Sequence, residues 1–319
     1  MTVLPHVSTI RDMLSPFFPA GGFMYIEIPF NFGSKRGIRK YQKDAECLLL
    51  SLKGEEFVHV VVAITNHIDN HSGDLFLSAD TRGEVFAASV DEFLDTLWSP
   101  LETILAGAVL YLFTCGSVVR QTESHQGLLQ SLSRYGLFFA VAFDAVRLQP
   151  NLTSMFLVSL TKSFIIEGFS FREAIVHSLS LSGQLGGHSN VLIIGLARDG
   201  HRIKVNVTKY SWAQLDTRPW GQDLPLQCPQ CGTPLPWARA KQGESYVFEY
   251  RFLSCGWDAK KRTRMRPPFR FTISRPNNIK MLPLGKKTGA GWLKILVGTH
   301  HFTFMEGTAV LEEDVEMDG

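Results

Sequence analysis

A cysteine and a histidine each stand directly behind an apolar run, at spacings that suit joint chemistry. The run over residues 108–114 ends at Cys115, and an earlier run over residues 57–65 ends two residues before His67. Apolar runs of this length, bounded by glycines or polar residues, are typical of strands buried in a parallel sheet. Open α/β sheets carry their chemistry where such strands end. If the two strands are neighbours, His67 lies beside Cys115, as nucleophilic catalysis by a thiolate requires.

The elements that must position these residues alternate along the first two hundred residues. Apolar runs predict strands at 23–30, 57–65, 108–114, 137–143 and 191–195. Helical spacing of apolar residues predicts helices at 41–53, 89–98, 123–135, 153–167 and 170–182. Ser89 and Glu92 have the spacing of a capping box at the start of the second of these helices. This alternation predicts βαβ units, an α/β fold and a mostly parallel sheet flanked by helices, over a first domain at 20–200.

The pattern changes after residue 200. Short alternating runs separated by proline, glycine and cysteine predict a small β-rich, cysteine-containing module over 201–305. The stretch from 306 to 319 is rich in acidic residues and poor in apolar ones, which predicts a disordered acidic tail.

The order of parts over residues 55–195 resembles the caspase-like (caspase–haemoglobinase fold) cysteine peptidases, most closely their CHAT and separase branch. In those families a strand ending in His-Gly is followed by a strand ending in Cys, and here VVAITNH (61–67) and LYLFTCGS (110–117) hold these places. The resemblance implies hydrolysis of peptide bonds, with Cys115 as the nucleophile and His67 as the base and later the acid. It also implies an oxyanion donor at the backbone amide of Gly116, and Asp144 as a carboxylate that binds a basic substrate side chain.

Two departures from the family pattern keep other interpretations open. His67 is followed by Ile68 instead of glycine, whereas His71 is followed by Ser-Gly and is an alternative base. One β-α unit precedes the His67 strand where the family has two. The alternative function is therefore a catalytically inactive caspase-like scaffold or interaction protein.

A second group of cysteines lies in the β-rich module. Cys228 and Cys231 have the two-residue gap and the following glycine of a zinc knuckle, and Cys255 is also followed by glycine. Phe252 stands where a zinc ribbon has its fourth cysteine, so His300 or His301 is the expected fourth ligand. The sequence thus predicts a degenerate zinc ribbon with a structural zinc ion, or a ribbon that has lost its metal.

Residues 260–266 contain five basic side chains, and Arg270 follows. Such a run is typical of a solvated loop, and the minority interpretations are a nuclear-import signal or a phosphate-binding patch. Nucleic-acid binding through 260–270, by a zinc-dependent module, is the least favoured of the three functions. We expect the partner of the chain to be a protein or a peptide, as substrate or as ligand.

Composition sets the remaining bounds. The 319 residues have 45% hydrophobic and 19% charged side chains and a formal net charge of +2, as in a globular protein with a sizeable core. No apolar run reaches the length of a membrane span. Five cysteines without an export signal predict an intracellular protein with reduced thiols, in the cytoplasm or the nucleus.

Overall fold

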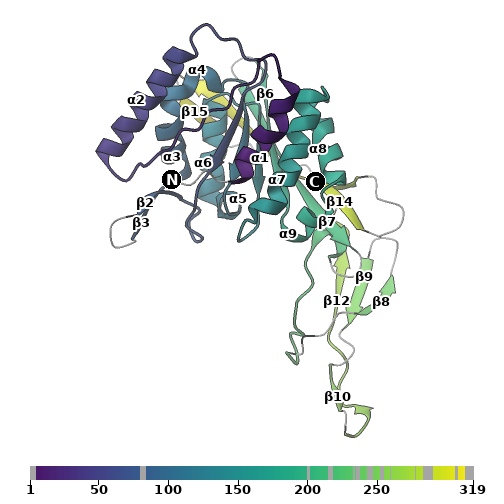
Figure 1. The fold of residues 1–319 in the computed structure, drawn as a ribbon. Coiled ribbons are helices and arrows are strands. Elements are labelled where there is room, and N and C mark those ends of the chain that lie inside the picture. Colours follow the sequence, from purple (N-terminus) through teal and green to yellow (C-terminus); the bar gives the residue numbers. More distant parts are fainter. Residues whose placement is uncertain are drawn as a thin grey trace. The chain divides into compact units, whose positions relative to one another are not determined.

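The chain forms two compact units. The structure is a computed structural model that describes residues 5–79, 84–199, 202–214, 218–232, 234, 238–242, 247–251, 255–258, 260–276, 278–282, 290–305 and 308–312. The first unit comprises Met1–Lys209 and Val297–Gly319, and the second comprises Tyr210–Leu296 (Figure 1). The cysteine-containing module is therefore an insertion, narrower than the expected 201–305, and the chain returns to the first unit after it.

A large sheet has most of its strands in the first unit. Its strand order is β1-β4-β5-β6-β7-β14-β13, and β15 also pairs with β14. The bounds of these strands are β1 (Val61–Thr65), β4 (Val109–Phe113), β5 (Phe139–Phe143), β6 (Val191–Asp199), β7 (Arg202–Gln214), β13 (Ile279–Met281), β14 (Ala290–Met305) and β15 (Thr308–Glu312). Strands β1, β4 and β5 run parallel, and β6 runs antiparallel to β5. The expectation of an α/β fold with a helix-flanked sheet and a β-rich region is confirmed.

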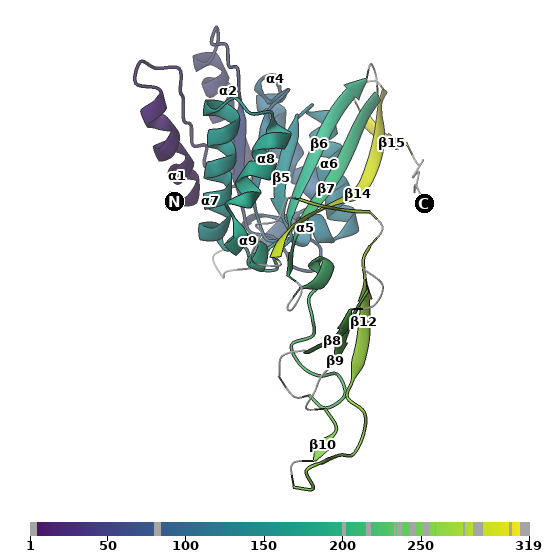
Figure 2. The same ribbon diagram turned by 90° about the vertical axis from the view of Figure 1, so that its right-hand side faces the viewer.

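Helices cover both faces of this sheet, as the two views show (Figures 1 and 2). Helices α1, α7, α8 and α9 pack as one group, and α3 packs on α6 in another. The helices of the unit are α1 (Pro5–Leu14), α2 (Lys35–Ser51), α3 (Val90–Trp98), α4 (Glu102–Leu105), α5 (Ser117–Arg120), α6 (Thr122–Arg134), α7 (Pro150–Thr161), α8 (Phe171–Ser180) and α9 (Gly183–His188). Every residue of β4 and β5 is buried, which explains why both strands are continuous apolar runs. None of the helices in the described ranges is both long and apolar enough to cross a bilayer.

Local capping differs from the expectation at one helix. Ser89 precedes α3, but its side chain makes no capping hydrogen bond, so the predicted capping box is wrong there. A complete box stands instead at α8, where the Ser170 side chain accepts from the Glu173 amide and the Glu173 carboxylate accepts from the Ser170 amide. This box fixes the start of α8 after the turn at Gly168, where the helix pair was expected to break.

The segment 23–30 was expected to be a strand and is not one. It contains Pro29, and among the described residues it forms no ladder with β1, which is the edge strand of the sheet. A cavity of about 940 Å³ lies between them, lined by side chains of this segment and by Val61, Ala63 and Thr65 of β1. The apolar run at 23–30 therefore lines a cavity beside the edge strand, and the sheet begins at β1.

The C-terminal stretch also differs from the expectation. Thr308–Glu312, predicted to belong to a disordered tail, forms β15 and pairs antiparallel with β14, with His301 opposite Glu312. The segment contains the apolar residues Ala309, Val310 and Leu311, which suit a strand, whereas most of the acidic residues lie further on. Residues 313–319 of the expected tail lie outside the described residues.

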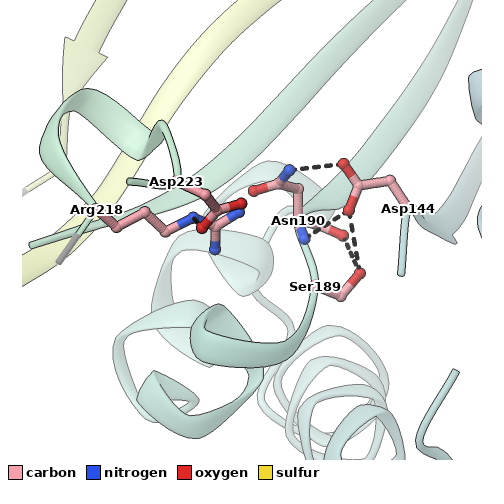
Figure 3. A network of polar contacts seen from close by, with 5 residues as sticks. All are labelled: Asp144, Ser189, Asn190, Arg218 and Asp223. Carbon is pink, nitrogen blue, oxygen red and sulfur yellow. Dashed lines mark hydrogen bonds and ion pairs between the residues drawn. The ribbon is translucent and has the colours of Figure 1, made fainter. Parts of the chain in front are cut away.

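The second unit consists of short strands and turns. Strands β8 (Ala238–Gln242), β9 (Val247–Arg251) and β12 (Arg270–Ser274) form a sheet in the order β12-β9-β8, and β10 (Trp257–Asp258) pairs with β11 (Thr263–Arg264). A turn precedes them, in which the Arg218 guanidinium forms an ion pair of 3.1 Å with Asp223 (Figure 3). A further hairpin, β2 (Leu75–Ala79) with β3 (Val85–Ala88), belongs to the first unit.

We expect one histidine of the core to make the first unit sensitive to acid. His125 of α6 has a buried Nε2 without a hydrogen-bond partner in the described structure, and burial, with His300 nearby, lowers its pKa to about 4. The unfolded chain therefore binds the proton more readily, so stability is complete above about pH 6.5 and falls by about 3 kcal/mol as the pH drops to about 4. Urea unfolding at several pH values should show this slope in the parent and in His177→Gln, whose histidine is exposed, and a flatter slope in His125→Phe.

Candidate functional site

The two strands that carry His67 and Cys115 are parallel neighbours. Val61 lies opposite Val109 and Thr65 lies opposite Phe113, so both strands end at the same edge of the sheet. His67 and Cys115 each follow two residues after the last pair of this ladder. The register thus brings the two positions to one edge, as the sequence predicted.

The His67 backbone is held tightly, whereas its ring is exposed. Its amide donates to the Asn66 side chain at 2.8 Å, and its carbonyl accepts from the Phe76 amide at 3.1 Å. The imidazole lies against Phe76, with 6.1 Å between ring centroids. Cys115 is half-buried and packs against the core, and among the described residues no hydrogen bond joins its thiol to His67. The Cys115–His67 dyad therefore stays a prediction.

The loop that carries His71 is docked beside Cys115. Ser117, two residues after Cys115, donates its hydroxyl to the Asn70 carbonyl at 3.0 Å, and Ser124 donates to the Ser72 carbonyl at 2.5 Å. Gly73 has a φ of +83°, and a Cβ there would lie 2.8 Å from the Ser117 carbonyl oxygen, so only glycine allows this close approach. The His71 ring is exposed on this anchored loop, and His71 remains an alternative base.

Asp69 gives the same loop its shape. Its Oδ1 accepts from the amides of His71 and Ser72, at 2.8 and 2.9 Å. These backbone donors, that of Ser72 first, lower the pKa of the Asp69 carboxyl. The Asp69 carboxylate therefore stabilises the turn in the loop that carries His71.

The turn after Cys115 packs directly on the turn after β5. The Gly116 amide donates to the Ala145 carbonyl at 2.7 Å, and a Cβ on Gly116 would lie 2.2 Å from the Asp144 carbonyl carbon. The amide thus has its acceptor inside the fold, and in this arrangement it does not point to an external oxyanion. This corrects the expectation that Gly116 supplies the oxyanion donor. Gly116 is required here by space, since its φ of −74° suits any residue.

Asp144 holds a neighbouring loop in place. Its carboxylate accepts from the Asn190 amide at 2.8 Å, from the Asn190 side chain at 2.6 Å and from the Ser189 hydroxyl at 3.4 Å (Figure 3). Ser189 also accepts from the Ala145 amide at 3.1 Å. These contacts tie the start of β6 to the end of β5. Asp144 therefore lies at the expected edge with its oxygens engaged, and its role in binding a substrate side chain stays a prediction.

The three predicted cysteines of the second unit come together. The sulfur atoms of Cys228, Cys231 and Cys255 all lie within 4.8 Å of one another, and no other described ligand residue belongs to the group. Cys228 and Cys255 are buried against Phe269, whereas Cys231 reaches the surface. Burial, the largest effect, and the two neighbouring thiols raise the pKa of the Cys255 thiol. A hydrogen bond from the Phe269 backbone lowers it in part.

This geometry suits a tetrahedral zinc ion. Zinc–sulfur bonds of about 2.3 Å place two sulfurs about 3.8 Å apart, so a small contraction would bring all three thiolates onto one ion. Gly232 and Gly256 have φ values of +71° and +73°, the left-handed conformation of a tight knuckle. His300 and His301, the expected fourth ligands, belong to the first unit, so a fourth ligand from one of them stays a prediction. Phe252, which stands where a zinc ribbon has its fourth cysteine, lies outside the described residues.

Sequence reasoning missed the residues that hold the edge together. Ser117, Ser124 and Asn190 connect the loops at the Cys115 edge, although none has a motif of its own. Only the structure distinguishes them: Ser117 is fully buried and Ser124 is 4% exposed, and buried polar side chains need hydrogen-bond partners.

The comparisons with known proteins add no family to this picture. No family model matches the chain, and neither a curated protein nor a solved structure matches it. The functional conclusion therefore depends on the site itself.

Proposed function

We propose that the first unit is a caspase-like cysteine peptidase domain in which Cys115 is the nucleophile and His67 the base. The observation that carries this proposal is the parallel β1–β4 pair, whose register ends both strands at one edge. The strand order β1-β4-β5-β6, with β6 reversed, is compatible with the family's order of parts. His71, on the loop anchored to Ser117, is the alternative base.

The proposed reaction is ordinary acyl transfer. The imidazole takes the thiol proton, and the thiolate attacks the peptide carbonyl carbon. The imidazolium then returns the proton to the leaving amine, and a thioester on Cys115 remains. Water attacks the thioester, the histidine again accepts a proton, and the carboxylic acid leaves with the thiol restored. Because Gly116 donates to Ala145, another group must stabilise the oxyanion.

Thiol reactivity tests the dyad without knowledge of the substrate. The protein is alkylated between pH 5.5 and 8, either with iodoacetamide or with a peptide that carries a thiol-reactive warhead. The modification of each cysteine is then followed by mass spectrometry. We expect half-buried Cys115 to react faster at pH 6 than exposed Cys47 of α2, because an imidazole partner favours the thiolate. His67→Ala should slow Cys115 at least tenfold and leave Cys47 unchanged.

Two variants complete this test. If His67 is the base, His71→Ala should leave the rate of Cys115 alkylation unchanged. If His71 is the base, His71→Ala should slow Cys115 at least tenfold and His67→Ala should not. His59→Ala is the matched control, since that ring packs on Phe164 with 4.7 Å between centroids and lies two residues before β1, at the end of the strand away from His67. If Cys115 reacts no faster than Cys47 in all forms, the peptidase proposal fails and the inactive scaffold of the same fold takes its place.

We also propose that Cys228, Cys231 and Cys255 bind a structural zinc ion in the second unit. Their proximity and the two left-handed glycines support this proposal. The thiolates of these three cysteines and one further ligand would complete the tetrahedral coordination of the zinc ion. The ion would hold two turns together in a unit whose strands β10 and β11 are only two residues long.

A further inference from the structure

The hairpin β10–β11 carries a dense group of cations that the proposed function does not use. Five basic residues lie between positions 260 and 266, and the side chains are all exposed: Lys260, Lys261, Arg262, Arg264 and Arg266. Asp258 is the only acidic residue from 255 to 270. The hairpin therefore presents a strongly positive surface, which we call the basic hairpin (residues 257–266).

The backbone explains why these cations point outward together. The Asp258 carboxylate accepts from the amides of Lys260 and Lys261, at 2.9 and 3.1 Å, and so bends the chain at the tip. Arg262 has a φ of +51°, which completes the turn back to β11. The Met265 amide donates to the Gly256 carbonyl at 2.8 Å and closes the base of the hairpin next to Cys255. The Asp258 carboxylate is thus hydrogen-bonded to the backbone of the turn, and it offsets only one of the five positive charges.

An aromatic ring lies among these cations. Trp257 is 52% exposed, and it stands directly opposite Arg264 in the two-stranded ladder, so their side chains share one face. The Arg264 guanidinium donates to the Cys255 carbonyl at 3.2 Å, which holds it in place beside the ring. Met265 is also 61% exposed. A half-exposed indole beside fixed cations is a platform on which a planar group can stack.

We propose that the basic hairpin binds single-stranded nucleic acid. Lysine and arginine side chains neutralise phosphates, and Trp257 stacks on an unpaired base, the combination that sequence-tolerant single-strand binding uses. The hairpin has no helix to enter a major groove, and an exposed ring finds no free base face on an intact duplex. An acidic peptide would use the cations and leave the indole without a partner. The proposal is independent of the Cys115 site.

The test measures binding of the full chain to fluorescein-labelled oligo(dT) of about 20 nucleotides by anisotropy. With about four phosphate contacts, affinity should fall about 50-fold between 50 and 200 mM salt. Lys260→Glu with Lys261→Glu should reduce both the affinity and the salt slope. Trp257→Ala should weaken binding about tenfold at an unchanged slope, and Trp257→Phe should restore most of the affinity, since stacking carries no salt dependence.

The controls separate specific binding from general charge attraction. Arg36→Glu with Arg39→Glu removes two equally exposed cations from α2 and should leave the affinity within about twofold. Thermal unfolding of each variant shows whether it is folded. The proposal is overturned if the parent does not bind at 50 mM salt or if the hairpin variants bind like the α2 control. Equal affinity for the matching duplex and for an acidic peptide, with no effect of Trp257→Ala, would also overturn it.

Discussion

Gly116→Ala should destabilise the first unit by about 3 kcal/mol or more and lower its melting temperature by about 6–12 °C. An added Cβ would lie 2.2, 2.3 and 2.5 Å from the carbonyl carbon, the oxygen and the Cα of Asp144. All three are backbone atoms of a buried turn, so none can rotate away as a side chain would. The two turns must separate, and the bond from the Gly116 amide to Ala145 lengthens or breaks.

Scanning calorimetry of the purified variant measures this effect. Gly187→Ala in α9 is the matched control, because a Cβ there meets nothing within 4 Å and alanine favours the helix. It should leave the stability unchanged or slightly higher. A Gly116→Ala protein as stable as the parent would show that the two turns do not pack as described.

Removal of zinc should unfold the second unit. Metal analysis is expected to find about one zinc ion per chain, and chelation should expose the three thiols of Cys228, Cys231 and Cys255 to a thiol reagent. Structural zinc contributes its binding free energy directly to folding, about 10 kcal/mol or more in small zinc modules, and the described core around these cysteines is small. The first unit has its own core and should keep its melting transition.

Cysteine variants provide the comparison. Cys255→Ser should lose the zinc ion, whereas Cys47→Ser, a change at an exposed thiol of α2, should retain it. Protein that is purified without zinc, with the second unit folded and all three thiols reactive, would contradict the metal site.

Buried apolar runs made the central part of the fold predictable from the sequence. Strands β4 and β5 are apolar because both faces of the sheet are covered there, and their parallel pairing follows from the helices between them. The same pattern failed at 23–30, because a segment that lines a cavity can be as apolar as a buried strand. An apolar pattern indicates which side chains are buried, but it does not show whether the backbone pairs with a neighbouring strand.

The sequence predicted where the residues of the candidate site lie in the fold, but it did not predict the hydrogen bonds between them. The ends of β1 and β4 placed His67 and Cys115 at one edge, and the two-residue cysteine gap placed Cys228 beside Cys231. The bond from Gly116 to Ala145 and the three donors to Asp144 arise from segments far apart in the chain. Such contacts depend on how turns pack, which no local pattern records.

The split of the first unit has a consequence for its biosynthesis. Its sheet needs β15 and the C-terminal part of β14, which follow the second unit in the chain, and among the described residues β15 pairs with β14 alone. As the ribosome extends the chain from its N-terminus, the continuous second unit can fold before the first has all its strands. Until residue 312 has emerged, the sheet of the nascent first unit lacks its final strand, β15.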